Sequence, residues 1–127
     1  MPSQGPPPIP PTSSGMGSSQ EPPVDRSVLG EWVGDDHATL DSMLAEFRDS
    51  IRADHASMLA ALARDDLAEY GMAIHRLRGA ALSMGARPLA RAAAVMDIAA
   101  RAKDTAGFRA GIPDLEEQLR LLLAHVR

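Results

Sequence analysis

The chain has 127 residues, a net charge of −4 from 17 acidic and 13 basic residues, and no cysteine. This length predicts one small domain, and the lack of cysteine excludes disulfides and thiolate nucleophiles and fits a reducing compartment. Dispersed basic residues and an aromatic content of 3% argue against nucleic-acid binding. No apolar run is long enough to cross a bilayer and the N-terminus lacks signal-peptide features, so we expect a cytoplasmic protein without direct membrane contact, or the cytoplasmic end of a membrane-anchored one.

The first 24 residues have the composition of a linker. Eight of the ten prolines fall within residues 1–23, together with many Gly and Ser. Because proline removes amide donors and little apolar surface is available for burial, we predict a disordered linker over residues 1–24 and a folded domain over residues 25–127. The run PPPIPP could alternatively be a ligand for an SH3-type groove. A linker indicates either the end of a larger protein or a tether that joins the domain to a partner.

From residue 25 onward apolar residues recur three and four positions apart, which is the spacing of helices with one buried face. Gly34 ends the first, short helix, and Asp35 or Asp36 can cap the next one. The predicted fold class is all-α, an antiparallel four-helix bundle with a short extra N-terminal helix. The predicted helices cover residues 26–33, 37–63, 67–84, 86–103 and 113–126.

The connections between these helices carry their own signals. Residues 64–66 form a turn and cap the third predicted helix, and Gly85 occupies a position where a left-handed residue would end it. Phe108 is expected to pack inward between the last two helices, and Pro113 breaks the helical run. Three of the four histidines suggest no site: His55 is expected to flank the core, His37 to be solvated, and His125 to lie near a frayed helix end.

His75 is the candidate functional residue. On a helical wheel it lies on the order of 120° from the centre of its helix's apolar stripe, so it should face solvent or the edge of the bundle. Gly71 and Gly79 lie one turn before and after it, although each glycine costs roughly 1 kcal/mol relative to alanine in a helix. Arg78 lies three residues on. The two glycines therefore suggest an imidazole that is deliberately left uncovered.

An exposed imidazole offers a nitrogen lone pair as a nucleophile or proton acceptor. Attack on a phosphoryl group needs open approach and a nearby cation, which the glycines and Arg78 can supply. Metal ligation lacks a second histidine at helical spacing, Ser83 is too far along the helix for a Ser–His pair, and GARPLA lacks the lysine of a phosphate-binding loop. The alternative is an ordinary surface histidine beside glycines that serve helix packing.

These residues resemble the signature of histidine-containing phosphotransfer (HPt) domains of bacterial phosphorelays, and the resemblance covers about residues 26–126. Three positions depart from the usual pattern: Arg78 replaces lysine, Ile74 replaces alanine and Asp97 replaces glutamate. In this sequence the pattern reads as His75, Leu77, Arg78, Gly79, Ala80, Ala81, Met84, Gly85 and Ala86, followed by Leu89, Ala93, Met96 and Asp97.

The resemblance implies a phosphorelay carrier. Nε2 of His75 would take a phosphoryl group from an aspartate of a receiver domain and pass it to an aspartate of a second receiver. Arg78 would be the stabilising cation and Gly79 the residue that gives clearance. No cofactor or metal of its own is expected, since the receiver would supply Mg²⁺, and no ATP-dependent kinase activity is expected. We further hypothesise that Gly71, Met72 and Leu82 belong to the docking surface.

The partners implied are the receiver domains of a hybrid sensor kinase, of a response regulator, or of both. The proline-rich start suits the C-terminal end of a hybrid sensor histidine kinase, with a free-standing carrier as the second possibility. The isolated domain is expected to be a monomer. The competing interpretation is a non-catalytic helical scaffold or dimerisation module in which His75 is incidental.

Overall fold

The computed structural model describes residues 21–25, 27–28, 34 and 36–126. Within these ranges the secondary structure is helical and contains no strand, which confirms the predicted all-α class. The helix predicted over residues 26–33 lies mostly outside the described residues. The helices are α3 (His37–Ala63), α4 (Leu67–Ser83), α5 (Arg87–Arg101), α6 (Thr105–Ala110) and α7 (Ile112–His125).

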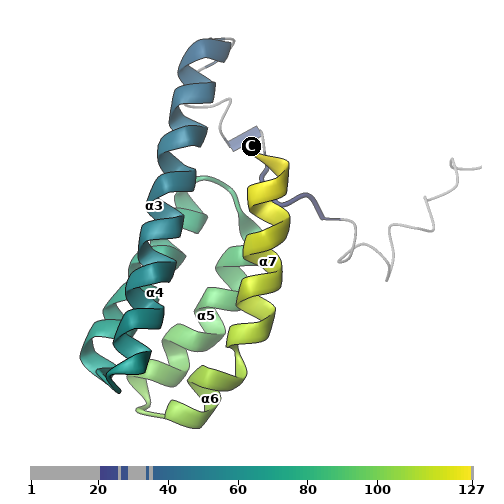
Figure 1. The fold of residues 1–127 in the computed structure, drawn as a ribbon. Helices are drawn as coiled ribbons and strands as arrows, with labels where there is room; N and C mark the ends of the chain where they lie inside the picture. The colour runs from purple at the N-terminus through teal and green to yellow at the C-terminus, as the bar shows by residue number, and fades with distance from the viewer. Residues whose placement is uncertain (1–20, 26, 29–33, 35, 127) are drawn as a thin grey trace, which may run out of the picture.

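The four longer helices lie side by side along one axis, as Figure 1 shows, with α6 at the end where α5 turns into α7. Helix α3 packs on α4, α4 on α5, and α5 on both α6 and α7. Short turns reverse the chain between neighbours, so the predicted antiparallel bundle is confirmed. The N-terminal end of α3 extends beyond the other helices.

The helices begin in two ways. Asp36, Asp66 and Asp104 each precede a helix and accept the backbone amide three residues on, at N···O distances of 2.9–3.2 Å. Helices α5 and α7 lack such a cap and instead carry proline in the first turn, at Pro88 and Pro113, where the missing amide donor is not needed. The sequence signals at residues 64–66 and at Pro113 therefore mark real helix starts.

Three described helix ends are followed by left-handed backbone, the first at Asp65 after α3 with φ +54°. Gly85 has φ +73° after α4, as predicted. Helix α5 ends at Arg101, two residues before the predicted end, because Lys103 itself adopts φ +58° and turns the chain toward α6. Helix α6 was not predicted as a helix, since its six residues are too few to show a periodic stripe.

The core lies along the bundle axis and is closed at the α6 end by an aromatic pair. The rings of Tyr70 and Phe108 are 4.4 Å apart between centroids, so the predicted inward packing of Phe108 is confirmed. Alanines on α5 let neighbouring helices approach closely. Each fully buried large apolar side chain contributes about 1.5–3 kcal/mol relative to exposure. Such side chains include Ile51, Met58, Ile74, Leu77, Met96, Phe108 and Leu115.

Residues 21–25, here called the N-terminal strap, lie against the α4–α5 turn. Val24 is buried, and the amide of Asp25 donates to the carbonyl of Gly85 at 2.8 Å. The Asp25 carboxylate also pairs with Arg87 at 2.7 Å, and Glu21 pairs with Arg91. Part of the segment predicted as a linker therefore packs on the bundle, while residues 1–20 lie outside the described part of the chain.

The charges of the strap are held by hydrogen bonds. The side-chain hydroxyl and the amide of Ser27 donate to Asp25, and these bonds lower the pKa of that carboxyl below its ordinary value. The hydrogen bond from Arg91 lowers the pKa of Glu21 in the same way. Both carboxylates therefore stay ionised at neutral pH, and each holds an arginine of α5.

Candidate functional site

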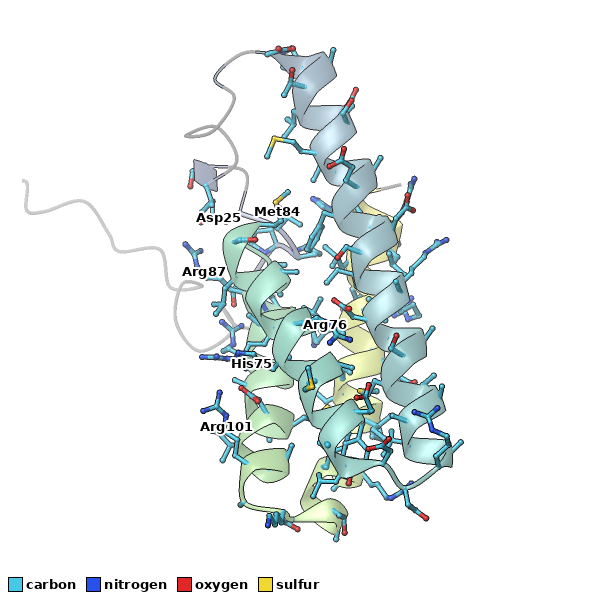
Figure 2. All side chains as sticks on the ribbon, turned by 90° about the vertical axis from the view of Figure 1, so that its left-hand side faces the viewer. Asp25, His75, Arg76, Met84, Arg87 and Arg101 are labelled. Atoms are coloured by element: carbon cyan, nitrogen blue, oxygen red, sulfur yellow. The ribbon has the colours of Figure 1, made fainter. Side chains whose placement is uncertain are left out.

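His75 projects from the open side of α4. Its side chain is 55% exposed, while Ile74 and Leu77 beside it are fully buried and fix the helix in the core. In Figure 2 the imidazole points to the same side of the molecule as Arg101 of α5. A Cβ built on Gly79, one turn after His75, would meet nothing within 4 Å, so a side chain at this position would project into open space. The predicted exposure of His75 is confirmed.

Asp97 of α5 lies behind the imidazole. It is the only buried charged or polar residue among those that the structure describes, with a side chain 8% exposed. Its Oδ2 is 3.2 Å from Nδ1 of His75 and 3.8 Å from the guanidinium of Arg78, and its Oδ1 is 3.5 Å from Nε of Arg101. A buried carboxylate is tolerated when cations and donors surround it, and these three groups provide them.

The contact with Asp97 decides which ring nitrogen is reactive. An ionised carboxylate can only accept hydrogen bonds, so a bond between the ring and Asp97 requires donation from Nδ1–H. A neutral imidazole has one proton, so Nε2 then carries the lone pair. Asp97 therefore orients the ring and leaves Nε2 as the nucleophilic atom. This proton assignment follows from the hydrogen-bond network.

A second group reaches the same nitrogen. Nη2 of Arg101 lies 3.3 Å from Nδ1 of His75, and the Arg101 side chain is 67% exposed. Because Arg101 lies four residues after Asp97 on α5, both side chains come from one face of the helix. Nδ1 thus has an acceptor and a donor within hydrogen-bonding distance.

A groove of about 530 Å³ lies between α4 and α5 beside the imidazole. Its lining is mainly apolar, with three cations. One of them, Arg76, also pairs with Asp54 of α3 at 3.2 Å, which ties the site helix to its other neighbour. The groove is lined by Leu67, Ala68, Gly71, Met72, His75, Arg76, Asp97, Ala100, Arg101 and Lys103.

The predicted docking residues lie in different places. Met72 is 56% exposed and lines the groove. Gly71 also lines it, but a Cβ there would lie 3.5 Å from the Cβ of Ala100, so this glycine faces α5 rather than the open side of the ring. The expectation that both glycines uncover His75 stays a prediction; a side chain on Gly71 would contact α5, whereas one on Gly79 would enter open space. Leu82 is 52% exposed but does not line the groove.

Sequence reasoning missed the roles of Asp97 and Arg101. One signal was available: Asp97 follows Met96 within the buried stripe of an alanine-rich helix, where a carboxylate needs a partner. Nothing in the local pattern identified that partner as His75, which lies 22 positions earlier in the chain.

The remaining predicted histidines agree with their expected surroundings. His55 is partly buried and contacts Glu116 of α7 at 2.9 Å, so it joins α3 to α7. His37 and His125 are exposed. In the described part of the chain, no three histidine, aspartate or glutamate side chains gather closely enough to hold a metal ion. None of the described helices is long and apolar enough to span a membrane.

The model of the Hpt domain family matches residues 42–127, which is more than half of the chain. The match includes His75, Asp97 and the whole of α4, α5, α6 and α7. A comparison with curated proteins finds no match, and neither does a comparison with solved structures. The chain belongs to the Hpt domain family, whose members act in phosphotransfer in two-component systems and interact with receiver domains.

Proposed function

We propose that this Hpt domain is the carrier of a phosphorelay, in which His75 takes a phosphoryl group from a receiver aspartate and passes it to the aspartate of a response regulator. The observation that carries this proposal is the contact between Nδ1 of the exposed His75 and the buried Asp97 at 3.2 Å. Donation of the Nδ1 proton to Asp97 would leave the lone pair on Nε2 as the nucleophile. An incidental surface histidine would not require a buried carboxylate behind it.

The transfer follows from this geometry. The Nε2 lone pair attacks the phosphorus of the aspartyl phosphate, and an N–P bond forms. The P–O bond to the donor aspartate breaks, and its electron pair stays on the carboxylate. The ring then carries the phosphoryl group on Nε2 and a proton on Nδ1, with the positive charge facing Asp97. Transfer to the second receiver reverses these steps on a different aspartate.

Two neighbours of His75 serve the reaction. Gly79 leaves room for the phosphoryl group and for the receiver's backbone, since no atom lies where its side chain would begin. Arg78, with a side chain 37% exposed, places a planar guanidinium where the usual lysine would place a point charge. Such a group can form paired hydrogen bonds to phosphoryl oxygens. The receiver contributes Mg²⁺ and most of the catalytic groups.

The receiver docks on the apolar groove beside His75. Gly71 and Met72 line the groove, and the exposed Leu82 extends the contact surface along α4. A small apolar surface around a reactive centre suits a transient partner, which must bind and leave at each transfer. By itself the domain would be a cytoplasmic monomer. In the proposed arrangement it forms the C-terminal end of a hybrid sensor kinase, and the proline-rich segment joins it to a receiver domain.

The experiment is a transfer assay with the isolated chain. A phosphorylated receiver domain from the same organism is mixed with the protein, and the product is tested for an acid-labile, alkali-stable phosphoryl group. We expect transfer to the wild type and none to His75→Gln. The matched control, His37→Gln, changes another exposed histidine and should accept as well as the wild type.

Two outcomes would contradict the proposal. Transfer that survives in His75→Gln would place the acceptor elsewhere. Failure of the wild type with every receiver of the organism, and also with the small donor phosphoramidate, would favour a scaffold in which His75 is incidental. Circular dichroism of His75→Gln shows whether the variant is folded, and so whether unfolding could explain a lost reaction.

A further inference from the structure

Nδ1 of His75 has two neighbours that make opposite demands. Oδ2 of Asp97, at 3.2 Å, can only accept a hydrogen bond. Nη2 of Arg101, at 3.3 Å, can only donate one. A single ring nitrogen either carries a proton or presents a lone pair, so it cannot satisfy both neighbours at once.

Each neighbour therefore favours its own tautomer. The bond to Asp97 needs the proton on Nδ1 and leaves the lone pair on Nε2, which is the form that attacks phosphorus. The bond from Arg101 needs the lone pair on Nδ1, so the proton of the neutral ring moves to Nε2, which can then no longer act as a nucleophile. The two side chains lie one helical turn apart on α5 and compete for one atom.

We propose that Arg101 is a positioning residue that opposes Asp97 at Nδ1, restraining phosphoryl acceptance by His75 and prolonging the life of the phosphohistidine. This inference rests on the proposed function. It adds a residue that controls two rates, those at which His75 accepts the phosphoryl group and loses it. In the free protein Arg101 withdraws part of the population from the reactive tautomer. In the phosphorylated protein Arg101 opposes protonation of Nδ1 and thereby slows loss of the phosphoryl group.

The second effect follows from the chemistry of the N–P bond. Once Nε2 holds the phosphoryl group and Nδ1 has released its proton to solvent, the neutral ring has its lone pair on Nδ1, and this lone pair accepts a hydrogen bond from Arg101. Loss of the group requires a proton on Nδ1, so that the ring departs as neutral imidazole. Water or an aspartate then attacks phosphorus, the Nε2–P bond breaks, and its electron pair returns to Nε2. Arg101 opposes that protonation, whereas Asp97 favours it.

The surroundings allow Arg101 to act in this way. Its side chain is largely exposed, and its Nε lies 3.5 Å from Oδ1 of Asp97 while its Nη2 lies 3.3 Å from Nδ1 of His75, so one guanidinium reaches both the carboxylate and the ring. The other cation at Asp97 is Arg78 of α4, at 3.8 Å. Arg76 and Lys103 line the adjoining groove. Among the hydrogen bonds of the described residues, the donor to the imidazole is Arg101 alone.

The first test reads the ring directly and needs no phosphotransfer. Nitrogen-15 NMR of the unphosphorylated chain reports the tautomer of His75 in the wild type, Arg101→Met and Arg101→Lys. We expect Arg101→Met to raise the ratio of Nδ1–H to Nε2–H roughly fivefold, the equivalent of one hydrogen bond. Arg101→Lys keeps a donor and should lie in between. The control is Arg120→Met, which removes an equally exposed arginine on α7.

The second test follows the phosphorylated protein. Phosphoramidate phosphorylates each variant, the donor is removed, and loss of the phosphoryl group is timed from acid to alkaline pH. We expect Arg101→Met to accept faster and to lose the group roughly fivefold faster at neutral pH. The two proteins should converge in acid, where Nδ1 is protonated in both. Arg120→Met should match the wild type throughout.

The outcomes separate the two proposals. An unchanged tautomer ratio in a folded Arg101→Met would overturn the competition at Nδ1, and an unchanged lifetime would overturn the protective role. If the wild type takes no phosphoryl group from any donor, the proposed function fails. The NMR result still decides whether Arg101 and Asp97 favour opposite tautomers of the His75 ring.

Discussion

At the scale of single residues, burial of the Asp97 carboxylate is electrostatically unfavourable but serves to position His75. Burying a lone carboxylate is unfavourable, and exposed arginines recover only part of the penalty because water screens them. The side chain of Arg101 is 67% exposed and that of Arg78 is 37% exposed. Stability alone therefore gives little reason for a carboxylate at this position. The contact with Nδ1 of His75 does give one, because it fixes the ring and selects Nε2.

Gly79 and Gly71 differ in what a side chain would meet, and this difference predicts two behaviours. A methyl group on Gly79 would project into open space, and one on Gly71 would make an ordinary contact with Ala100. Since alanine is favoured over glycine within a helix, Gly79→Ala and Gly71→Ala should each raise the free energy of unfolding by up to about 1 kcal/mol. Urea titrations measure this.

Larger side chains separate the two positions further. Gly79→Leu should fold normally yet accept phosphoryl groups from a receiver much more slowly, because the side chain occupies the open side of His75. Gly71→Leu should lose stability against Ala100 on α5. If Gly79→Leu accepted as fast as the wild type, Gly79 would not be the residue that gives clearance.

At the scale of elements, the sequence predicted the helices because each long helix carries one apolar stripe and recognisable ends. Asp66 and Gly85 act as the residue types at those positions suggest. Helix α6 could not be predicted in this way, since six residues make less than two turns. The position of residues 21–25 could not be predicted either, because Val24 finds its partners through tertiary packing.

The site divides along the same line. His75, Gly79 and Arg78 lie within five residues of one helix, so their mutual placement follows from helical geometry alone. Asp97 and Arg101 meet His75 only because α5 packs against α4 in one register. The register in which two helices pack cannot be deduced from the residue spacing of a single sequence. The groove likewise exists only once both helices are in place.

The N-terminal strap yields a prediction about Gly85. Both Gly85 and Gly34 have positive φ, at +73° and +60°. A Cβ on Gly85 would lie 3.0 Å from the carbonyl oxygen of Asp25, whereas one on Gly34 would meet nothing within 4 Å. Left-handed backbone costs roughly 1–2 kcal/mol for a residue with a side chain. Gly34→Ala should lose at most about this amount, and Gly85→Ala should lose more.

Thermal and urea unfolding of the two alanine variants measure this difference. Hydrogen exchange adds a local readout, since displacement of the strap should expose the amide of Asp25, which donates to Gly85. Faster exchange at Asp25 is expected in Gly85→Ala and not in Gly34→Ala. If the two variants were equally destabilised and the amide of Asp25 exchanged at the wild-type rate in both, packing of the strap would not require glycine at position 85.

At the scale of the whole molecule, charge is distributed unevenly. The chain carries a net charge of −4, yet the groove beside His75 is lined by three cations, Arg76, Arg101 and Lys103, and by one carboxylate, that of Asp97. The phosphoryl donors and acceptors in the proposed relay are aspartates, and a phosphoryl group adds further negative charge. A cationic site on an acidic molecule orients an anionic partner before contact and raises the rate of productive encounter.

This arrangement predicts that phosphotransfer depends on salt. The Debye length falls from roughly 20 Å at about 25 mM salt to roughly 6 Å at about 250 mM, so the second-order rate with a receiver should fall several-fold over that range.

Lys103→Met removes one cation of the groove, and it should lower the transfer rate at low salt and flatten its dependence on salt. Arg120→Met removes the same charge on α7, where the arginine pairs with Glu117, and should keep the wild-type slope. Stopped-flow or quench-flow transfer assays with one phosphorylated receiver measure these slopes. If both variants kept the wild-type slope, the groove cations would not steer the encounter. If both flattened it equally, overall charge rather than the groove would set the rate.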